Sequence, residues 1–296
     1  MSEMLGKIPE FVDFGEAAKT ADDEELERVY LRENNYLAVI GYKTLEDFAR
    51  FTSSEDLSID TIEYAGKDRV YFTGLKRRAV YRRASEAILR EYTSDYSCAT
   101  PDHQCMNCYN CYTYGGTNLV KGKTKSIRSR MKMTTSYSIQ SSMDAVVDED
   151  EFHIMVHRDL EMAQKEEGQE KGSIHTITLI KPNTVFPFID IIFNPTKFDV
   201  AMYLETIERG DAEGYGSKGS LLGTMSTEIL GIIDDLDVTH RDLLDAIKVT
   251  DDGEVDASEA KSLIDESISK KELENLKDEL PDLIEKHRGK IYPDLE

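Results

Sequence analysis

The sequence predicts an α+β fold, a sandwich of the split β-α-β kind, and the second half of the chain carries the clearest signal. Thr184–Phe193 is an apolar run rich in isoleucine and phenylalanine, which is typical of a buried strand. Asn194 follows as a helix N-cap with Pro195 at the first helical position, and the helix is expected to end at Gly210. After a glycine-rich loop, Thr224–Ile233 repeats the strand pattern. This strand–helix–loop–strand unit, with further strands and a helix upstream, predicts the sandwich.

The upstream elements follow from hydrophobic spacing. In chain order they are an acidic N-terminal segment over residues 1–35, a core strand over Tyr36–Tyr42, a stretch of helical spacing over 44–51, a hairpin over Thr61–Thr73 that turns at Gly66, and a helix over Ala79–Tyr92. The last helix is expected to carry Ala84 and Ile88 on one face and Arg82 and Glu86 on the opposite one.

Two further regions are expected to be additions to this core. A polar excursion over Gln164–Ser173 separates two β-like runs, which predicts a long hairpin or an inserted arm, because its residues cannot pack as core. From Asp234 to Glu296 the chain has 20 Asp/Glu against 9 Lys/Arg and apolar residues at helical spacing, with a break at Pro281. We therefore expect acidic helices over 236–296, packed on the rim of the core.

Composition limits the class of protein. The chain has 296 residues, a net charge of −22 and 40% hydrophobic residues, which is enough for a large core. Its longest apolar runs fall far below the roughly 20 residues of a membrane-spanning helix. The N-terminus has neither a basic region nor an apolar stretch of the kind found in signal peptides. We expect a cytoplasmic protein with no membrane partner.

All four cysteines lie within 14 residues, at Cys98, Cys105, Cys108 and Cys111. In a cytoplasmic chain such clustering favours a metal over disulfides. Four soft ligands at this spacing suit tetrahedral zinc, and a site closed by four protein ligands is structural. A [4Fe–4S] cluster is the rival interpretation. His103 could also replace one of the cysteines as a ligand.

The cysteines lie within a basic island. Residues 66–132 carry 14 Lys/Arg against 5 Asp/Glu, a local balance of +9 in a chain of −22. This contrast predicts a groove that binds a polyanion, with interleaved tyrosines as stacking platforms for bases. The tyrosines are Tyr81, Tyr92, Tyr96, Tyr109, Tyr112 and Tyr114. The expected phosphate contacts are Lys76, Arg77, Arg78, Lys121, Lys123, Lys125, Arg128 and Arg130, joined by Gly214, Gly216, Lys218 and Gly219 of the glycine-rich loop.

Three segments together resemble a known family. They are the cysteine region with the following "KTKSIRSRMKMTTSYSI", the stretch "FPFIDIIFNPTKFDVAMYLETIERG", and "GYGSKGSLLGTMSTEILGII". The sequence is similar to the backbone subunit of the type I-D CRISPR interference complex, a member of the RAMP superfamily. The resemblance implies an RRM-like, ferredoxin-like core over 36–235, with a zinc-binding insertion over 93–116 and the hairpin arm over 147–182.

The resemblance also implies a non-enzymatic function. Subunits of this kind stack along CRISPR RNA and present it for pairing with invading DNA, so the implied partners are CRISPR RNA, target DNA, further copies of the chain and other subunits of the complex. In that family the sheet and the glycine loop contact the RNA backbone, and the hairpin reaches toward the next subunit.

Two other functions remain open from the residues alone. A metal-dependent ribonuclease, like the backbone subunits of type III complexes, would use Asp190, Asp102 or Asp211 to hold a divalent ion. A zinc-ribbon regulator would bind duplex DNA, although the sequence offers no recognition helix for it.

Overall fold

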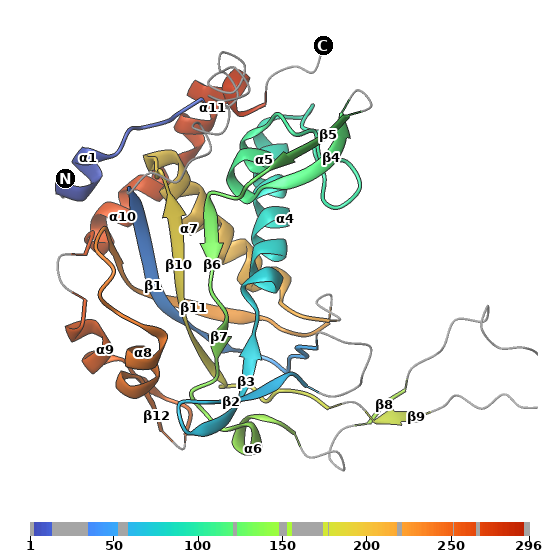
Figure 1. Ribbon diagram of the computed structural model, residues 1–296, viewed down its shortest axis with the longest axis vertical. Coiled ribbons are helices and arrows are strands. Elements are labelled where there is room, and N and C mark those ends of the chain that lie inside the picture. Colours follow the sequence, from blue (N-terminus) through green and yellow to red (C-terminus); the bar gives the residue numbers. More distant parts are fainter. Residues whose placement is uncertain are drawn as a thin grey trace, which may run out of the picture.

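The computed structural model describes residues 3–13, 35–52, 59–120, 123–147, 153–155, 174–176, 178–217, 221–250, 252–264 and 267–292. A four-stranded sheet in the order β11-β1-β10-β6 forms the centre of the molecule (Figure 1). Every neighbouring pair in it is antiparallel. The strands are β1 (Tyr36–Leu45), β6 (Met131–Met133), β10 (Val185–Phe193) and β11 (Met225–Ile233).

Strand β1 contributes to the cores on both faces of the sheet, because successive side chains of a strand point in opposite directions. Leu37 and Val39 belong to the larger cluster of buried apolar residues, whereas Ala38 and Ile40 belong to a second cluster. The core strand predicted from Tyr36 is confirmed, and it continues to Leu45.

Two long helices, α4 (Gly74–Tyr92) and α7 (Lys197–Glu213), pack against each other on the face that carries the larger cluster. Helix α7 follows β10 and precedes β11. Both strands pair antiparallel with β1, so they run in the same direction with β1 between them. The predicted strand–helix–strand unit is therefore present, and its two strands are separated by β1.

Both ends of α7 differ from the prediction. The N-cap is Thr196 rather than Asn194: its hydroxyl oxygen accepts a hydrogen bond from the Asp199 amide, and the Asp199 carboxylate accepts one from the Thr196 amide. This reciprocal pair satisfies two helix-end donors, more than a single asparagine cap could. At the other end the helix continues past Gly210 to its C-cap, Gly214, which has φ of 85°.

The opposite face of the sheet is also covered. Helices α8 (His240–Ala246) and α9 (Ser258–Ser262) lie over it (Figure 1). Leu243 of α8 and Ala260 of α9 share the second buried cluster with Ile40 of the sheet. Both faces of the sheet are therefore packed with side chains.

The other two C-terminal helices, α10 (Lys270–Asp278) and α11 (Leu280–Ile291), pack on the long helices. α10 contacts α7, and α11 contacts both α4 and α7. Pro281 lies in the first turn of α11, as the predicted break requires. The C-terminal helices thus lie over both layers of the core, which corrects the expectation that they would pack on its rim.

The remaining elements are short. They are α1 (Glu3–Lys7), β2 (Thr61–Tyr64), β3 (Lys67–Phe72), α5 (Tyr109–Tyr114), β4 (Gly116–Val120), β5 (Lys123–Ile127), β7 (Ser136–Tyr137), α6 (Ser142–Ala145), β8 (His153–Met155), β9 (Ile174–Thr176), β12 (Lys248–Val249) and β13 (Val255–Asp256).

The hairpin of β2 and β3 is confirmed. The helical spacing over 44–51 is misleading, because Ala49 and Arg50 form isolated bridges with Ile180 and Gly216 instead.

A second hairpin lies within 147–182, where β8 and β9 pair antiparallel. At its base, the Val147 amide donates to the Leu179 carbonyl, so the two ends of the insertion lie side by side. The rest of the expected arm, and most of the expected acidic segment 1–35, fall outside the described residues. Within the described ranges, none of the helices combines the length and the apolar composition that a membrane crossing requires.

Candidate metal centre and nucleic-acid interface

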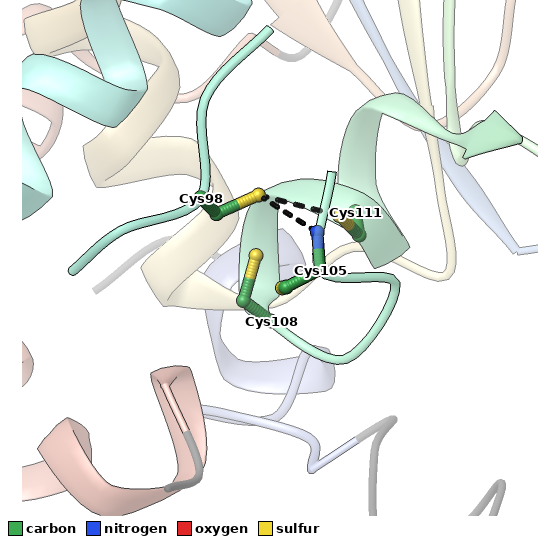
Figure 2. A group of neighbouring side chains, drawn as sticks. All are labelled: Cys98, Cys105, Cys108 and Cys111. Carbon is green, nitrogen blue, oxygen red and sulfur yellow. Dashed lines mark hydrogen bonds between the residues drawn. The ribbon is translucent and has the colours of Figure 1, made fainter. Parts of the chain in front are cut away.

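The four cysteines come from residues 98–108 and the short helix α5, and they converge on one point (Figure 2). All four sulfur atoms lie within 4.8 Å of one another, and the Sγ atoms of Cys98 and Cys111 are 3.6 Å apart. None of the four is in a disulfide, and all are buried. Zinc at about 2.3 Å from each sulfur would hold tetrahedral sulfurs about 3.8 Å apart, so the cluster fits a single metal ion.

Hydrogen bonds to two of the sulfurs, those of Cys98 and Cys111, favour the thiolate form that a metal requires. The Cys105 amide donates to Cys98 Sγ at 3.5 Å, and Arg82 Nη2 lies 3.5 Å from Cys111 Sγ. Hydrogen bonds from the neighbouring thiols lower the pKa of Cys111, and the Arg82 charge contributes to this shift. His103 is exposed and lies outside the group of ligands found in the described chain, so the structure gives it no part in the site.

Helix α4 supports the cysteine loop through a polar face that the sequence analysis placed opposite the buried one. Arg82 and Glu86 are 5% and 2% exposed, and they are linked by a 3.1 Å ion pair. Glu86 accepts hydrogen bonds from the amide and hydroxyl of Thr100, and the Ser85 hydroxyl donates to Asn110 of α5 at 2.6 Å. These side chains are buried because the cysteine loop and α5 cover them.

A groove with a positively charged lining runs beside the cysteine module, which consists of residues 98–108 and α5. Two adjoining cavities of about 370 and 280 Å³ lie between the first half of α4 and residues 126–133. Leu75, Arg78, Ala79 and Arg82 line them from the helix. Their spacing of three and four residues places them on one helical face. Leu75 and Arg78 border both cavities.

The opposite wall of the groove comes from the second basic run. Arg128 and Lys132 are exposed and line the smaller cavity, and Ser129 borders both cavities. Arg78 and Arg128, 50 positions apart in the chain, therefore lie on one groove, as the two basic runs predicted. The structure thus joins part of each run into a single cationic surface.

Two of the expected phosphate contacts are instead internal. Arg77 is completely buried, and its Nη2 lies 2.5 Å from an Asp190 carboxylate oxygen. Arg130 is 6% exposed and forms two hydrogen bonds, of 2.8 and 2.9 Å, with the Asp199 carboxylate. A guanidinium held in a buried carboxylate pair cannot reach a phosphate at the surface, so both assignments are corrected.

The other expected contacts divide into three groups. Lys76 turns away from the groove, and its Nζ donates to the Thr52 carbonyl at 2.7 Å. Lys123 and Lys125 lie on β5, but the structure describes only their backbone; Lys121 lies outside the described residues. Lys218 and Gly219 also lie outside the described residues.

The described part of the glycine loop is tied to the core. The Ser217 amide donates to the Arg50 carbonyl, and a Cβ on Gly216 would lie 2.4 Å from that carbonyl oxygen. Gly216 also has φ of 93°, so glycine is required there on both counts. Neither Gly214 nor Gly216 lines the two cavities. The structure therefore does not bring this part of the loop to the groove.

Burial also changes the expected roles of the tyrosines and the sheet. Among the tyrosines proposed as stacking platforms, only Tyr92 is substantially exposed, at 37%, and the other five are buried. Burial raises the pKa of Tyr96 well above its usual value, so its protonated hydroxyl can donate to Cys108 Sγ, 3.2 Å away. The sheet face that was expected to meet RNA lies beneath α8 and α9. Five of the six proposed tyrosines and this sheet face are therefore packed inside the protein, and of the six only Tyr114 borders a cavity of the groove.

The acidic residues considered for a nuclease occupy different environments. Asp190 is 1% exposed and bonded to Arg77 and to the Tyr203 hydroxyl. Asp211 is paired with Lys43 at 2.5 Å. Asp102 is exposed in the cysteine loop. The first two carboxylates are already neutralised by buried cations, which disfavours a catalytic divalent ion at either one.

Lys132 and Leu75 line the groove and were not predicted from the sequence as contact residues. Lys132 belongs to the second basic run, and its place in that run was the available signal. Leu75 is an apolar residue, 66% exposed, that borders both cavities. Its only signal was its position three residues before Arg78 on one helical face.

Comparison with protein families finds that a family model described as "Csc2 Crispr" matches residues 60–289. The match covers the cysteine module, the groove and most of the C-terminal helices. Comparison with curated proteins gives no match. Among solved structures, the crystal structure of Thermofilum pendens Csc2 aligns with a TM-score of 0.51 at 16% identity, covering 86% of this chain and 78% of that one. This likeness shows a shared fold.

Two further structures align with lower scores. A "CRISPR RNA-guided surveillance complex" has a TM-score of 0.43 at 10% identity, covering 88% of this chain and 85% of that chain. A "Type IV-B CRISPR Complex" has a TM-score of 0.42 at 12% identity, covering 66% and 90%.

Proposed function

Because this chain belongs to the Csc2 CRISPR family, we propose that it is the RNA-binding backbone subunit of a type I-D interference complex. The observation that carries this proposal is the groove, in which Arg78, Arg128 and Lys132 meet although the whole chain has a charge of −22. Such a contrast concentrates a polyanion on one surface and discourages contacts elsewhere.

The proposed role is structural. CRISPR RNA would lie in the groove, copies of the chain would assemble along it, and the exposed bases would pair with target DNA in the cytoplasm beside the other subunits. The burial of Asp190 and Asp211 in ion pairs supports a non-enzymatic subunit over a ribonuclease. The path β1–α4–β6–β10–α7–β11 with sheet order β11-β1-β10-β6 supports an RRM-like, ferredoxin-like core.

We further propose that the four cysteines bind one structural zinc ion. Cys98, Cys105, Cys108 and Cys111 supply four ligands and leave no open position for a substrate. Metal analysis of the purified protein should find about one zinc per chain, and Cys108→Ser should release it. Iron with visible absorbance in place of zinc would establish the [4Fe–4S] alternative.

The decisive experiment measures fluorescence anisotropy of labelled single-stranded RNA, single-stranded DNA and duplex DNA over a range of salt concentrations. We expect tight, sequence-tolerant RNA binding that weakens steeply with salt, and assemblies that lengthen with the RNA. The double variant Arg78→Glu/Arg128→Glu should bind every RNA sequence at least about tenfold more weakly. The salt slope, which is the slope of log affinity against log salt concentration, should become shallower by about 1.4, because two phosphate contacts are lost.

A matched control keeps the same change in net charge away from the groove. Lys270 and Lys290 are exposed on α10 and α11, so Lys270→Glu/Lys290→Glu should leave the salt slope unchanged. Equal losses in the two double variants would mean that total charge, rather than the groove, governs binding. A preference for duplex DNA would instead support a regulator.

A further inference from the structure

Leu75 is an exposed apolar side chain in the middle of the cationic groove. It lies in the first turn of α4, is 66% exposed, and borders both cavities together with Arg78. A single exposed leucine on a protein surface is ordinary. Its place between two cavities, with Arg78 beside it and Arg128 and Lys132 across the groove, needs a more specific explanation.

The helix backbone holds Leu75 in this position from two sides. A Cβ on Gly74 would lie 2.0 Å from the Met133 carbonyl oxygen, so only glycine allows α4 to begin so close to β6. Arg77, two residues after Leu75, is fixed in the core by Asp190 and by the Ser136 hydroxyl at 2.6 Å. With its first turn fixed in this way, the helix directs Leu75 into the groove.

We propose that Leu75 is a base-contacting residue, and that neighbouring bases of the bound strand occupy the two cavities on either side of its side chain. This inference rests on the proposed function, because it takes single-stranded RNA as the ligand of the groove. The cations alone account for phosphate contacts. Leu75 supplies what they lack, an apolar surface against which a base can lose contact with water.

The size and chemistry of the cavities fit this ligand. The smaller one, of about 280 Å³, has room for about nine water molecules at roughly 30 Å³ each, comparable to a pyrimidine base of about eight heavy atoms. Every base has an apolar face, so contact with leucine does not select a sequence. Such a contact suits a subunit that holds guides of any sequence.

The test compares two ligands of equal charge: a single-stranded RNA decamer, and a ribose-phosphate oligomer of the same length without bases. The ratio of the two affinities measures the contribution of base contacts, whichever bases of the strand lie beside Leu75. We expect the intact protein to prefer the RNA, and Leu75→Ala to lower that preference by about three- to tenfold. Leu75→Phe should keep or raise it, because an aromatic ring stacks on bases.

Leu263→Ala is the matched control, because Leu263 is also exposed, at 42%, and lies outside the groove after α9. Thermal unfolding of Leu75→Ala should match that of the intact protein, since the side chain is mostly in water. The inference would be overturned, and the groove left in place, if Leu75→Ala kept the affinity ratio of the intact protein, even with both affinities lower. The same would follow if the intact protein bound the two ligands equally well. Failure of the intact protein to bind either ligand would overturn the proposed function itself.

Discussion

Arg77 and Arg78 are adjacent on α4 and have opposite environments. Arg77 is fully buried in an ion pair with Asp190, whereas Arg78 lines both cavities of the groove. A helix turns about 100° per residue, so neighbours face different surroundings. The second basic run repeats the contrast, with Arg130 buried against Asp199 and Arg128 exposed. A basic run can therefore supply both an internal ion pair and a binding surface.

The largest predicted effect comes from breaking the internal pair. Arg77→Met leaves the Asp190 carboxylate buried without its guanidinium, and we expect a loss of about 3–5 kcal/mol in the free energy of unfolding, measured with urea. Arg78→Met should change it by less than about 0.5 kcal/mol, because that side chain borders the groove.

A double variant sharpens this contrast. In Arg77→Met/Asp190→Asn no charge remains buried at the pair, so the loss should be smaller than in Arg77→Met alone. If Arg77→Met unfolded at the same urea concentration as the intact protein but bound RNA more weakly, Arg77 would belong to the groove and the comparison would fail.

The contrast also explains which features the sequence could predict. The strand–helix–strand unit and the cysteine cluster depend on local patterns, such as apolar runs and ligand spacing, and both are present. The basic runs also indicated a cationic surface, but not which members form it. That division depends on Asp190 and Asp199, which come from β10 and α7 far along the chain.

Segments that cover aromatic and polar side chains were the other source of error. Tyr96 and Tyr109 are interleaved with basic residues, a pattern that suits stacking on bases, yet tertiary packing buries both. Arg82 and Glu86 are polar and were placed opposite the buried face of α4, but the cysteine loop covers them. A helix with hydrophilic residues on one side can therefore be buried on that side when an inserted module supplies polar partners.

A second, smaller effect on the free energy of unfolding is expected from His240, at the start of α8. Its Nε2 lies 2.7 Å from the Thr134 hydroxyl, and burial, helped by the Arg77 charge, lowers the pKa of His240 to about 4. An unfolded histidine titrates near 6.5. Between these values the unfolded state binds the extra proton, so the free energy of unfolding should fall by up to about 3 kcal/mol as pH drops from 6.5 to 4.

His240→Gln isolates this contribution, because glutamine can still hydrogen-bond to Thr134 and does not titrate. Urea denaturation at pH 7.5 and 4.5 should show a smaller loss of stability in the variant. Protonation of carboxylates and release of metal lower the stability of both proteins, so these contributions cancel when the two stability losses are subtracted. Equal losses in the two proteins would show that His240 takes up its proton without cost in the folded state.

The smallest predicted effect tests the exposed members of the second run one at a time. Lys132→Ala and Arg128→Ala should each weaken RNA binding by about three- to tenfold and lower the salt slope by about 0.7, because each removes one phosphate contact. Neither should move the midpoint of thermal unfolding, since both side chains are exposed at the groove. Anisotropy and thermal unfolding on the same samples separate the two outcomes. A variant that lost stability but kept its salt slope would belong with Arg77 and Arg130, and the groove would then lack that cation.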